Sequence, residues 1–139
     1  MSKIAIVTDS TAYLPEEIIS TYQINVVPLV VIWGEETFLD NVEIGPEEFY
    51  KRLSTAEQMP STSQPSIQAF YDVFKRLHAE GYDILTIVIS SALSGTLDSA
   101  LQAKKMLPDA NIALVDSQYT SLPMAFMALA AARAAKTVC

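Results

Sequence analysis

The sequence predicts an α/β domain in which a mainly parallel sheet carries helices on both faces, a three-layer α/β/α arrangement. Three short apolar runs, residues 4–7, 84–89 and 111–115, have the composition of buried strands. Each run ends in a polar loop followed by a helical pattern, and this alternation is typical of parallel sheets. The 139 residues, half of them hydrophobic, suffice for one domain with a sizeable core.

Several shorter elements lie between the first two strands. Two are helices that begin with Pro-Glu-Glu, a sequence that suits a first helical turn, and they cover residues 15–22 and 46–54. Residues 24–33 are rich in β-branched side chains, but Pro28 favours an edge strand, a bulge or a bend. A turn and a short returning strand are predicted at 34–39.

The second half predicts three helices. The first follows a polar loop at 55–64, is capped by Ser66, carries a regular apolar stripe and ends near Gly81. The other two cover residues 96–106 and 121–138. Because the chain stops at an apolar helix with no polar tail, we expect all 139 residues to form one domain of a longer protein that lacks its C-terminal domain.

Composition excludes several classes of partner. The net charge is -7 and the nine Lys and Arg residues form no basic stripe, so we expect no binding to nucleic acid or to an anionic membrane surface. Residues 121–135 are Ala-rich and too short for stable membrane insertion. The single cysteine, Cys139, allows neither a disulfide framework nor a cysteine-based zinc site. We interpret it as an incidental thiol and predict a cytoplasmic protein.

Two hydroxyl-rich turns are the most informative local feature. One is the run Pro-Ser-Thr-Ser-Gln-Pro-Ser at 60–66, and the other is Ser-Ser-Ala-Leu-Ser-Gly-Thr at 90–96. Each turn opens a helix, whose first N–H groups are unpaired and carry partial positive charge. Hydroxyls add donors without adding full charge. Together the turns predict a neutral cradle for a small anionic group such as a carboxylate or a phosphate.

The predicted topology brings further polar side chains to these turns, because the carboxyl ends of parallel strands lie at one edge of a sheet. The expected crevice at this edge is lined by Asp9, Ser10, Thr62, Ser63, Ser94, Gly95, Thr96 and Ser117.

Each motif also has a structural interpretation. Ser94 or Thr96 is equally well explained as a helix N-cap, and the 60–66 run as an ordinary loop. Asp9 and Asp116 are expected mainly as structural hydrogen-bond acceptors at strand ends.

Other chemistries are disfavoured. The P-loop and dinucleotide glycine patterns are absent, and no cluster of residues has metal-ligand spacing, so we expect no cofactor and no metal. Ser94 remains an alternative as the nucleophile of a hydrolase or transferase. The only histidine, His78, is expected on a solvated helix at the opposite end of the sheet, so a base is lacking. A regulatory domain without a ligand is a third interpretation.

Six motifs in the same order resemble the DegV family over nearly the whole chain. Singly each is weak, but together they are specific. They are Ile-Ala-Ile-Val-Thr-Asp-Ser-Thr at 4–11, Leu-Pro-Glu-Glu at 14–17, Val-Val-Pro-Leu at 26–29, Thr-Ser-Gln-Pro-Ser at 62–66, Ile-Ser-Ser-Ala-Leu-Ser-Gly-Thr at 89–96 and Val-Asp-Ser at 115–117.

The resemblance implies a carrier and not an enzyme. Members of this family are bacterial proteins that hold a long-chain fatty acid, such as palmitate, between two α/β domains. Some present it to a separate fatty acid kinase, which phosphorylates the carboxylate. By this resemblance, Thr62 and Ser94 hold the carboxylate, Gly95 and Thr96 complete the turn, and the Asp9–Ser10 loop borders the head group.

Two departures from the family pattern matter. The family is about twice as long, so this chain would leave the binding tunnel half open and is expected to bind weakly or to form a homodimer. In addition, Leu-Pro-Met-Ala-Phe at 122–126 stands where a glycine-rich helix start is common, and these large side chains are expected to narrow the pocket or change the preferred acyl length.

Overall fold

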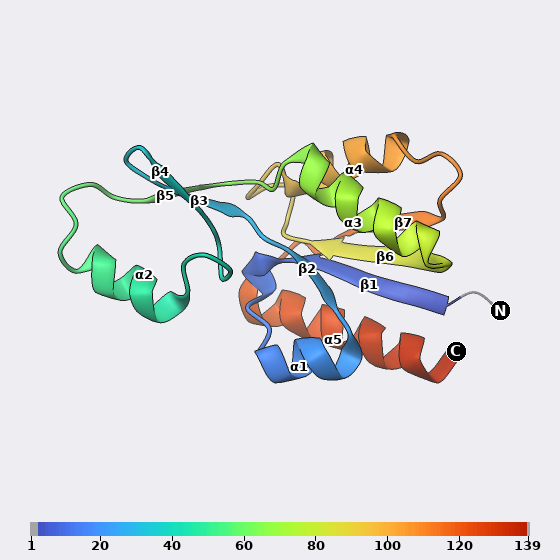
Figure 1. Ribbon diagram of the computed structural model, residues 1–139. Coiled ribbons are helices and arrows are strands. Elements are labelled where there is room, and N and C mark those ends of the chain that lie inside the picture. Colours follow the sequence, from blue (N-terminus) through green and yellow to red (C-terminus); the bar gives the residue numbers. More distant parts are fainter. Residues whose placement is uncertain (1–2, 139) are drawn as a thin grey trace.

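A computed structural model describes residues 3–138 and consists of a three-layer body with a smaller projecting arm (Figure 1). The body is a four-stranded parallel sheet with helices on both faces, as predicted. The arm, which we define as residues 28–64, holds a three-stranded antiparallel sheet and one helix.

All neighbouring strands of the body sheet are parallel, so their carboxyl ends lie at one edge. The first strand is central and pairs along its length with the strand from the second half of the chain, Lys3 with Tyr82 through Thr8 with Ile87. In spatial order the strands are β2 (Asn25–Val27), β1 (Lys3–Asp9), β6 (Tyr82–Val88) and β7 (Ile112–Asp116).

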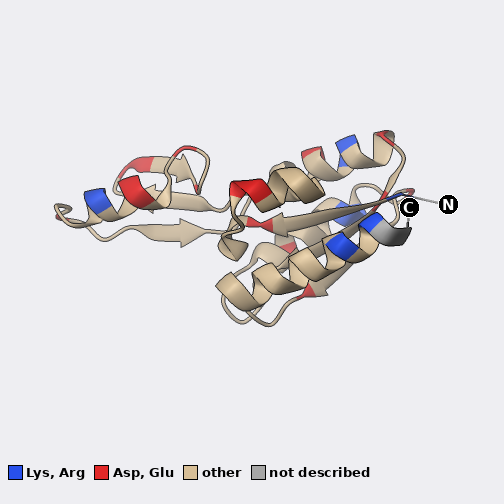
Figure 2. Ribbon diagram, turned by 90° about the horizontal axis from the view of Figure 1, so that it is seen from below, with Lys and Arg blue, Asp and Glu red and all other residues tan. Residues whose placement is uncertain are grey.

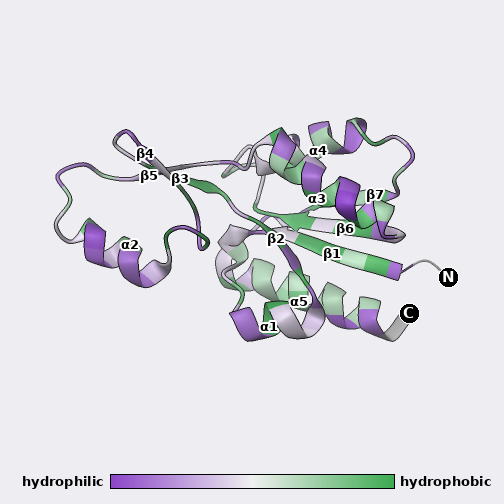
Figure 3. Cartoon of the chain, viewed as in Figure 1, coloured by the Kyte–Doolittle hydropathy of each residue, from purple (hydrophilic) through white to green (hydrophobic). Residues whose placement is uncertain are grey.

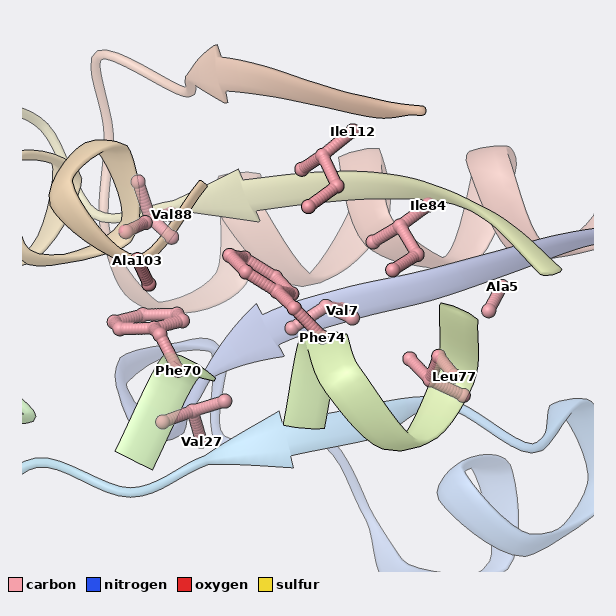
Figure 4. Close-up of a cluster of buried hydrophobic side chains, with 11 residues drawn as sticks. Ala5, Val7, Val27, Phe70, Phe74, Leu77, Ile84, Val88, Ala103 and Ile112 are labelled. Atoms are coloured by element: carbon pink, nitrogen blue, oxygen red, sulfur yellow. The ribbon is translucent and has the colours of Figure 1, made fainter. Parts of the chain in front are cut away.

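One face of the sheet is covered by two helices, α3 (Ile67–Ala79) and α4 (Thr96–Lys105). Phe70 and Phe74 of α3 are fully buried against this face, with their ring centroids 5.7 Å apart (Figure 4). They fill the space between α3 and inward-facing strand residues such as Val7. Burial of side chains of this size contributes about 1.5–3 kcal/mol each, so this cluster is a main source of stability.

Local sequence signals set the ends of α3 as predicted. The Ser66 side chain accepts a hydrogen bond of 3.0 Å from the Ala69 N–H and caps the first turn. Gly81 adopts φ +89° and its N–H donates to the His78 carbonyl, which ends the helix in the conformation that glycine favours.

The other face is covered by α1 (Glu16–Tyr22) and α5 (Ser121–Val138), and a short 3-10 helix, η1 (Ser10–Ala12), lies between β1 and α1. The buried stripe of α5 consists mostly of alanines, which allow this helix to lie close to the sheet. In Figure 3, hydrophobic residues lie in the central strands and along α5, whereas the arm helix is hydrophilic. No described helix is long and apolar enough to cross a membrane.

Pro28 separates the predicted strand at 24–33 into two strands of different sheets. The second of them, β3 (Val30–Trp33), turns away from the body and forms the centre of the arm. It pairs antiparallel with β4 (Glu36–Leu39) and with β5 (Ser61–Ser63). The prediction of a loop throughout 55–64 is therefore wrong for β5, whose polar sequence forms a strand only because β3 offers it a paired edge.

The arm has its own small core beneath its helix, α2 (Pro46–Leu53). Trp33 is buried there, and its ring centroid lies 5.4 Å from that of Phe49. The Arg52 guanidinium lies 4.8 Å from the Trp33 ring centroid and donates at 2.7 Å to Glu36, which joins α2 to the strands.

The core contains two hydroxyl groups without a hydrogen-bond partner among the described residues, those of Thr8 and Thr86. An unpaired buried hydroxyl is unfavourable, and valine has the same shape without it. We expect Thr86→Val to raise the free energy of unfolding by about 1 kcal/mol in urea titrations. The exposed-site control Thr55→Val is expected to stay within about 0.5 kcal/mol of wild type. Destabilisation by Thr86→Val would contradict this account.

Candidate functional site

The carboxyl edge of the body sheet carries the loops that contain most of the predicted site residues. All four strands end there, and three of them pass into a loop that leads to a helix: β1 to η1, β6 to α4, and β7 to α5. Hydrogen bonds between these loops fix their relative positions. The site is therefore built on a rigid edge, to which the arm adds one more segment.

Asp9 is the central connection of this edge. It is fully buried, and its Oδ2 accepts a hydrogen bond of 2.7 Å from the Ile89 N–H at the end of β6. Its Oδ1 accepts from the Thr11 N–H at 2.8 Å and from the Thr11 hydroxyl. Asp9 thus acts as the expected structural acceptor. It joins the ends of β1 and β6 and caps η1.

Burial raises the pKa of the Asp9 carboxyl above its ordinary value, and the hydrogen bonds from Thr11 and Ile89 offset part of that effect. The neighbouring Asp40 carboxylate also raises it. Two carboxyls therefore lie near this edge.

Ser10 connects the edge to the base of the arm. Its hydroxyl donates to Asp40 Oδ2 at 2.8 Å and accepts from the Leu29 N–H at 3.0 Å. The Asp40 N–H in turn donates to the Leu29 carbonyl at 2.9 Å. Ser10 is buried and both of its hydrogen-bonding roles are used, so its place in the site is to position the arm.

The turn between β6 and α4 presents the hydroxyl of Ser94. The N–H groups of Leu93 and Ser94 both donate to the Ser90 carbonyl, which closes the turn tightly. The Ser94 hydroxyl oxygen accepts from the Thr96 N–H at 3.3 Å and lies 2.9 Å from the Thr96 hydroxyl. Thr96 is fully buried, whereas Ser94 is half-buried. Ser94 therefore offers a partly accessible hydroxyl directly at the first N–H groups of α4.

The space around Gly95, and not its backbone conformation, favours a residue without a side chain. Its φ is -81°, a value open to any residue. A Cβ at this position would instead lie 3.1 Å from the Gln64 side-chain nitrogen and 3.2 Å from its Cδ. Gln64 thus packs directly on Gly95 and brings the end of β5 beside the Ser94 turn. The two hydroxyl-rich turns were expected at one crevice, but no sequence pattern indicates this particular contact of Gln64 with Gly95.

The third loop, after β7, is held to the second. Asp116 accepts from the Ser91 hydroxyl at 2.6 Å and from the Gln118 N–H at 2.9 Å, and these bonds hold the pKa of Asp116 below its ordinary value. The Ser117 hydroxyl donates to the Tyr119 carbonyl at 3.0 Å, and Ser117 is buried. Asp116 is thus a structural acceptor, as expected, and Ser117 shapes the loop from within.

Thr62 and Ser63 lie in β5, on the arm. In register, Thr62 pairs with Val31 and Ser63 with Val30. Thr62 is exposed, and within residues 3–138 its side chain makes no hydrogen bond to the Ser94 turn. Because residues two apart in a strand are about 6.6 Å apart, the contact of Gln64 with Gly95 places Thr62 near that turn.

The structure therefore brings Asp9, Ser10, Ser94, Gly95, Thr96 and Ser117 to one edge and places Thr62 and Ser63 on the adjoining strand. Among the predicted site residues, Thr62 is exposed and Ser63 and Ser94 are half-buried, so these three offer accessible hydroxyls. Asp40 and Gln64, which position the arm, were not among the predicted site residues. His78 is exposed in the last turn of α3, at the end of that helix away from the Ser94 turn. No group of potential metal ligands occurs among the described residues.

Comparison with known proteins places this fold and edge in a family. A family model described as "Uncharacterised protein, DegV family" matches residues 3–137. The chain therefore belongs to the DegV family, which confirms the resemblance found in its motifs.

Relatives match the whole chain but are about twice its length. The chain is 41% identical over 137 residues to a DegV domain-containing protein of Halalkalibacterium halodurans, covering 98% of this chain and 48% of the relative. It is 37% identical over 134 residues to Protein DegV of Bacillus subtilis, covering 96% and 47%. The chain thus spans about half the length of these relatives.

Solved structures agree closely with the fold. DegV from Bacillus subtilis, described as a fatty acid binding protein, matches with a TM-score of 0.91 and 37% identity over 99% of this chain and 49% of that one. A DegV family protein from Thermus thermophilus, described by its fatty acid binding, matches with a TM-score of 0.89 and 34% identity over 97% and 48%.

The Gln64–Gly95 contact predicts the effect of a small substitution. In Gly95→Ala, the new methyl group displaces the flexible Gln64 side chain, so we expect the fold to be retained with a loss of less than about 1 kcal/mol. A crystal structure or NMR spectrum should show the displacement of Gln64. Gly45→Ala is the matched control, because a Cβ at Gly45 meets nothing within 4 Å. An unmoved Gln64 in Gly95→Ala would contradict this packing.

The half-buried Asp40 predicts a pH dependence. Burial raises the pKa of its carboxyl above 3.8, so its contribution to stability is full below that pH and is lost as pH rises through the folded-state pKa. We expect Asp40→Asn to be more stable than wild type near neutral pH, by less than about 1 kcal/mol because the group is partly hydrated. This advantage should shrink below pH 3.8 in urea titrations. An advantage independent of pH would contradict the assignment.

Proposed function

We propose that this chain supplies the carboxylate-binding half of a long-chain fatty acid carrier. The observation that carries the proposal is the half-buried Ser94 hydroxyl at the start of α4, beside the β5 segment that bears Thr62. A carboxylate accepts hydrogen bonds from hydroxyls and from helix N-terminal N–H groups. The fatty acid binding described for the related solved structures supports this choice over a phosphate.

The edge also offers apolar surface for an acyl chain. Five large apolar or aromatic side chains that are more than half exposed lie in the loops and first helical turns at the carboxyl edge; they are Tyr13, Leu93, Tyr119, Leu122 and Phe126. Each buried methylene contributes about 0.8 kcal/mol, so the tail should dominate the affinity.

The first two turns of α5 carry both buried and exposed apolar side chains. Met124 is fully buried and its sulfur lies 3.6 Å from the Thr11 hydroxyl oxygen, so it fills the body core. Leu122 and Phe126 are 61% and 62% exposed. We infer that Leu122 and Phe126, and not Met124, affect the preferred acyl length.

In the complete carrier the remaining half of a longer chain would cover this surface, and a separate fatty acid kinase would phosphorylate the bound carboxylate. In that step a carboxylate oxygen attacks the terminal phosphorus of a nucleoside triphosphate. An acyl phosphate forms, and the nucleoside diphosphate leaves. A cradle of hydroxyls and N–H groups without a bound cation leaves the carboxylate more reactive than an arginine clamp would. We propose a cytoplasmic location and no cofactor besides the lipid.

Two other functions are less well supported. A hydrolase that uses Ser94 needs a base, and His78 lies at the far end of α3. A regulatory domain without a ligand would leave the accessible Ser94 hydroxyl and the apolar edge unexplained.

Substitution of the two hydroxyls proposed to bind the carboxylate tests the proposal. Since a hydrogen bond to a charged group contributes about 1.5–3 kcal/mol, we expect Ser94→Ala to weaken palmitate binding at least roughly tenfold, with a similar loss for Thr62→Ala. Binding can be measured by titration of the purified protein and by native mass spectrometry with extraction of the bound lipid.

Ser91→Ala is the matched control, because Ser91 lies in the same turn but its hydroxyl is bound to Asp116. It should leave palmitate binding unchanged. Equal palmitate retention by wild type, Ser94→Ala and Thr62→Ala would overturn the proposed carboxylate site. Turnover of acyl esters that depends on Ser94 would support the hydrolase instead.

A further inference from the structure

The body has a cavity of about 680 Å³ at the amino edge of the sheet, the end opposite to Ser94. It lies beside residues 3–6 of β1 and between the last turns of α3 and α5. We call this cavity the amino-edge slot. None of the residues assigned to the carboxylate site lines it.

The slot lies where β2 would continue if it were longer. β1 runs over Lys3–Asp9, but β2 pairs only with Val7–Asp9, so the first half of β1 has a neighbour on the β6 side alone. The Asn25 side-chain nitrogen donates to the Ile6 carbonyl at 3.2 Å, which shows that Ile6 directs its peptide groups to the β2 side of β1 and that its carbonyl already accepts a bond from β2. Because alternate residues of a strand direct their peptide groups to the same side, Ile4 presents its N–H and carbonyl to the slot.

The slot is lined by residues from both faces of the sheet. On one face its lining includes Leu77 of α3, and on the other Ala132 and Ala135 of α5, whose small side chains leave room. The neighbouring β1 residues follow the same division: Ala5 belongs to the cluster under α3, and Ile4 packs with the cluster under α5.

The charge of the slot is positive although the chain carries a net charge of -7. Lys3, Arg76 and Lys136 line it, against the single carboxylate of Glu80. Lys3 lies 4.7 Å from the Tyr82 ring centroid, and Arg76 donates at 2.7 Å to the neutral Asn25 side chain. In the part of the chain that the structure describes, none of these three cations has a carboxylate within 4.0 Å.

These cations have a partial structural role, because Arg76 and Lys136 also offset the negative ends of α3 and α5. Lys3 is in a strand and offsets no helix end. Figure 2 shows Lys and Arg segments gathered at the end of the body where α5 ends.

We propose that the amino-edge slot binds an extended acidic peptide segment of a partner protein, which adds to the sheet as a strand beside β1. Backbone hydrogen bonds to Ile4 and to the Ile6 N–H would provide affinity, and acidic side chains facing Lys3, Arg76 and Lys136 would provide selectivity. A second copy of this chain fits less well, because pairing of two β1 edges would bring like charges together. The proposal does not depend on the fatty acid function.

The test uses the 139-residue chain and two capped hexapeptides. One is Val-Glu-Val-Asp-Glu-Val, whose acidic residues face both sides of an extended strand, and the other is its analogue with Lys at every acidic position. We expect the acidic peptide alone to bind, and to slow hydrogen exchange of the Ile4 and Ile6 amides. Lys136→Glu should weaken binding by roughly two- to fivefold, the range for an exposed ion pair. The control Lys75→Glu, on α3 but outside the slot lining, should change little.

Three results would overturn the proposal: no binding of the acidic peptide up to about 1 mM, equal binding of the acidic and basic peptides, or amide protection confined to other strands. A dimer whose dissociation exposes the Ile4 amide would assign the slot to a second copy and also overturn it. Palmitate binding, measured in parallel, should be the same with and without Lys136→Glu.

Discussion

The buried carboxyl of Asp9 is the interaction on which the geometry of the carboxyl edge depends. It joins the end of β1 to the end of β6 and caps η1, using both oxygens within the protein. A charged group without solvent is unfavourable unless donors surround it, so the loops must lie where their N–H groups reach Asp9. Its raised pKa records that cost. The Ser94 turn follows directly from the strand end that Asp9 holds.

The arm depends on a second, weaker set of connections. The Ser10 hydroxyl, the Leu29 N–H and the Asp40 carboxylate fix its base, and Gln64 on Gly95 fixes its far strand against the body. The rigid body edge therefore provides the accessible hydroxyl of Ser94, and the arm provides those of Thr62 and Ser63. A ligand held between them would be sensitive to both connections.

Much of the fold followed from the sequence because its signals are local. Apolar runs, the Ser66 cap and Gly81 defined the body strands and α3 correctly. β5 was missed because Ser61–Ser63 has no intrinsic strand preference and depends on pairing with β3. For the site, the hydroxyls and Asp9 were found from strand ends, whereas Gln64 and Asp40 act through tertiary contacts that no spacing indicates. The contact of Gln64 with Gly95 could likewise not be predicted, because it joins two segments that are distant in the sequence.

The central claim is that a fatty acid carboxylate binds at the Ser94 turn. The most direct measurement is an amide NMR titration of the isotope-labelled protein with palmitate, followed at each backbone N–H. The account predicts the largest shifts at Ser94, Gly95 and Thr96, with further shifts in β5 at Thr62. Saturable shifts confined to the amino edge near Ile4, or no shift at the Ser94 turn with bound palmitate, would contradict it.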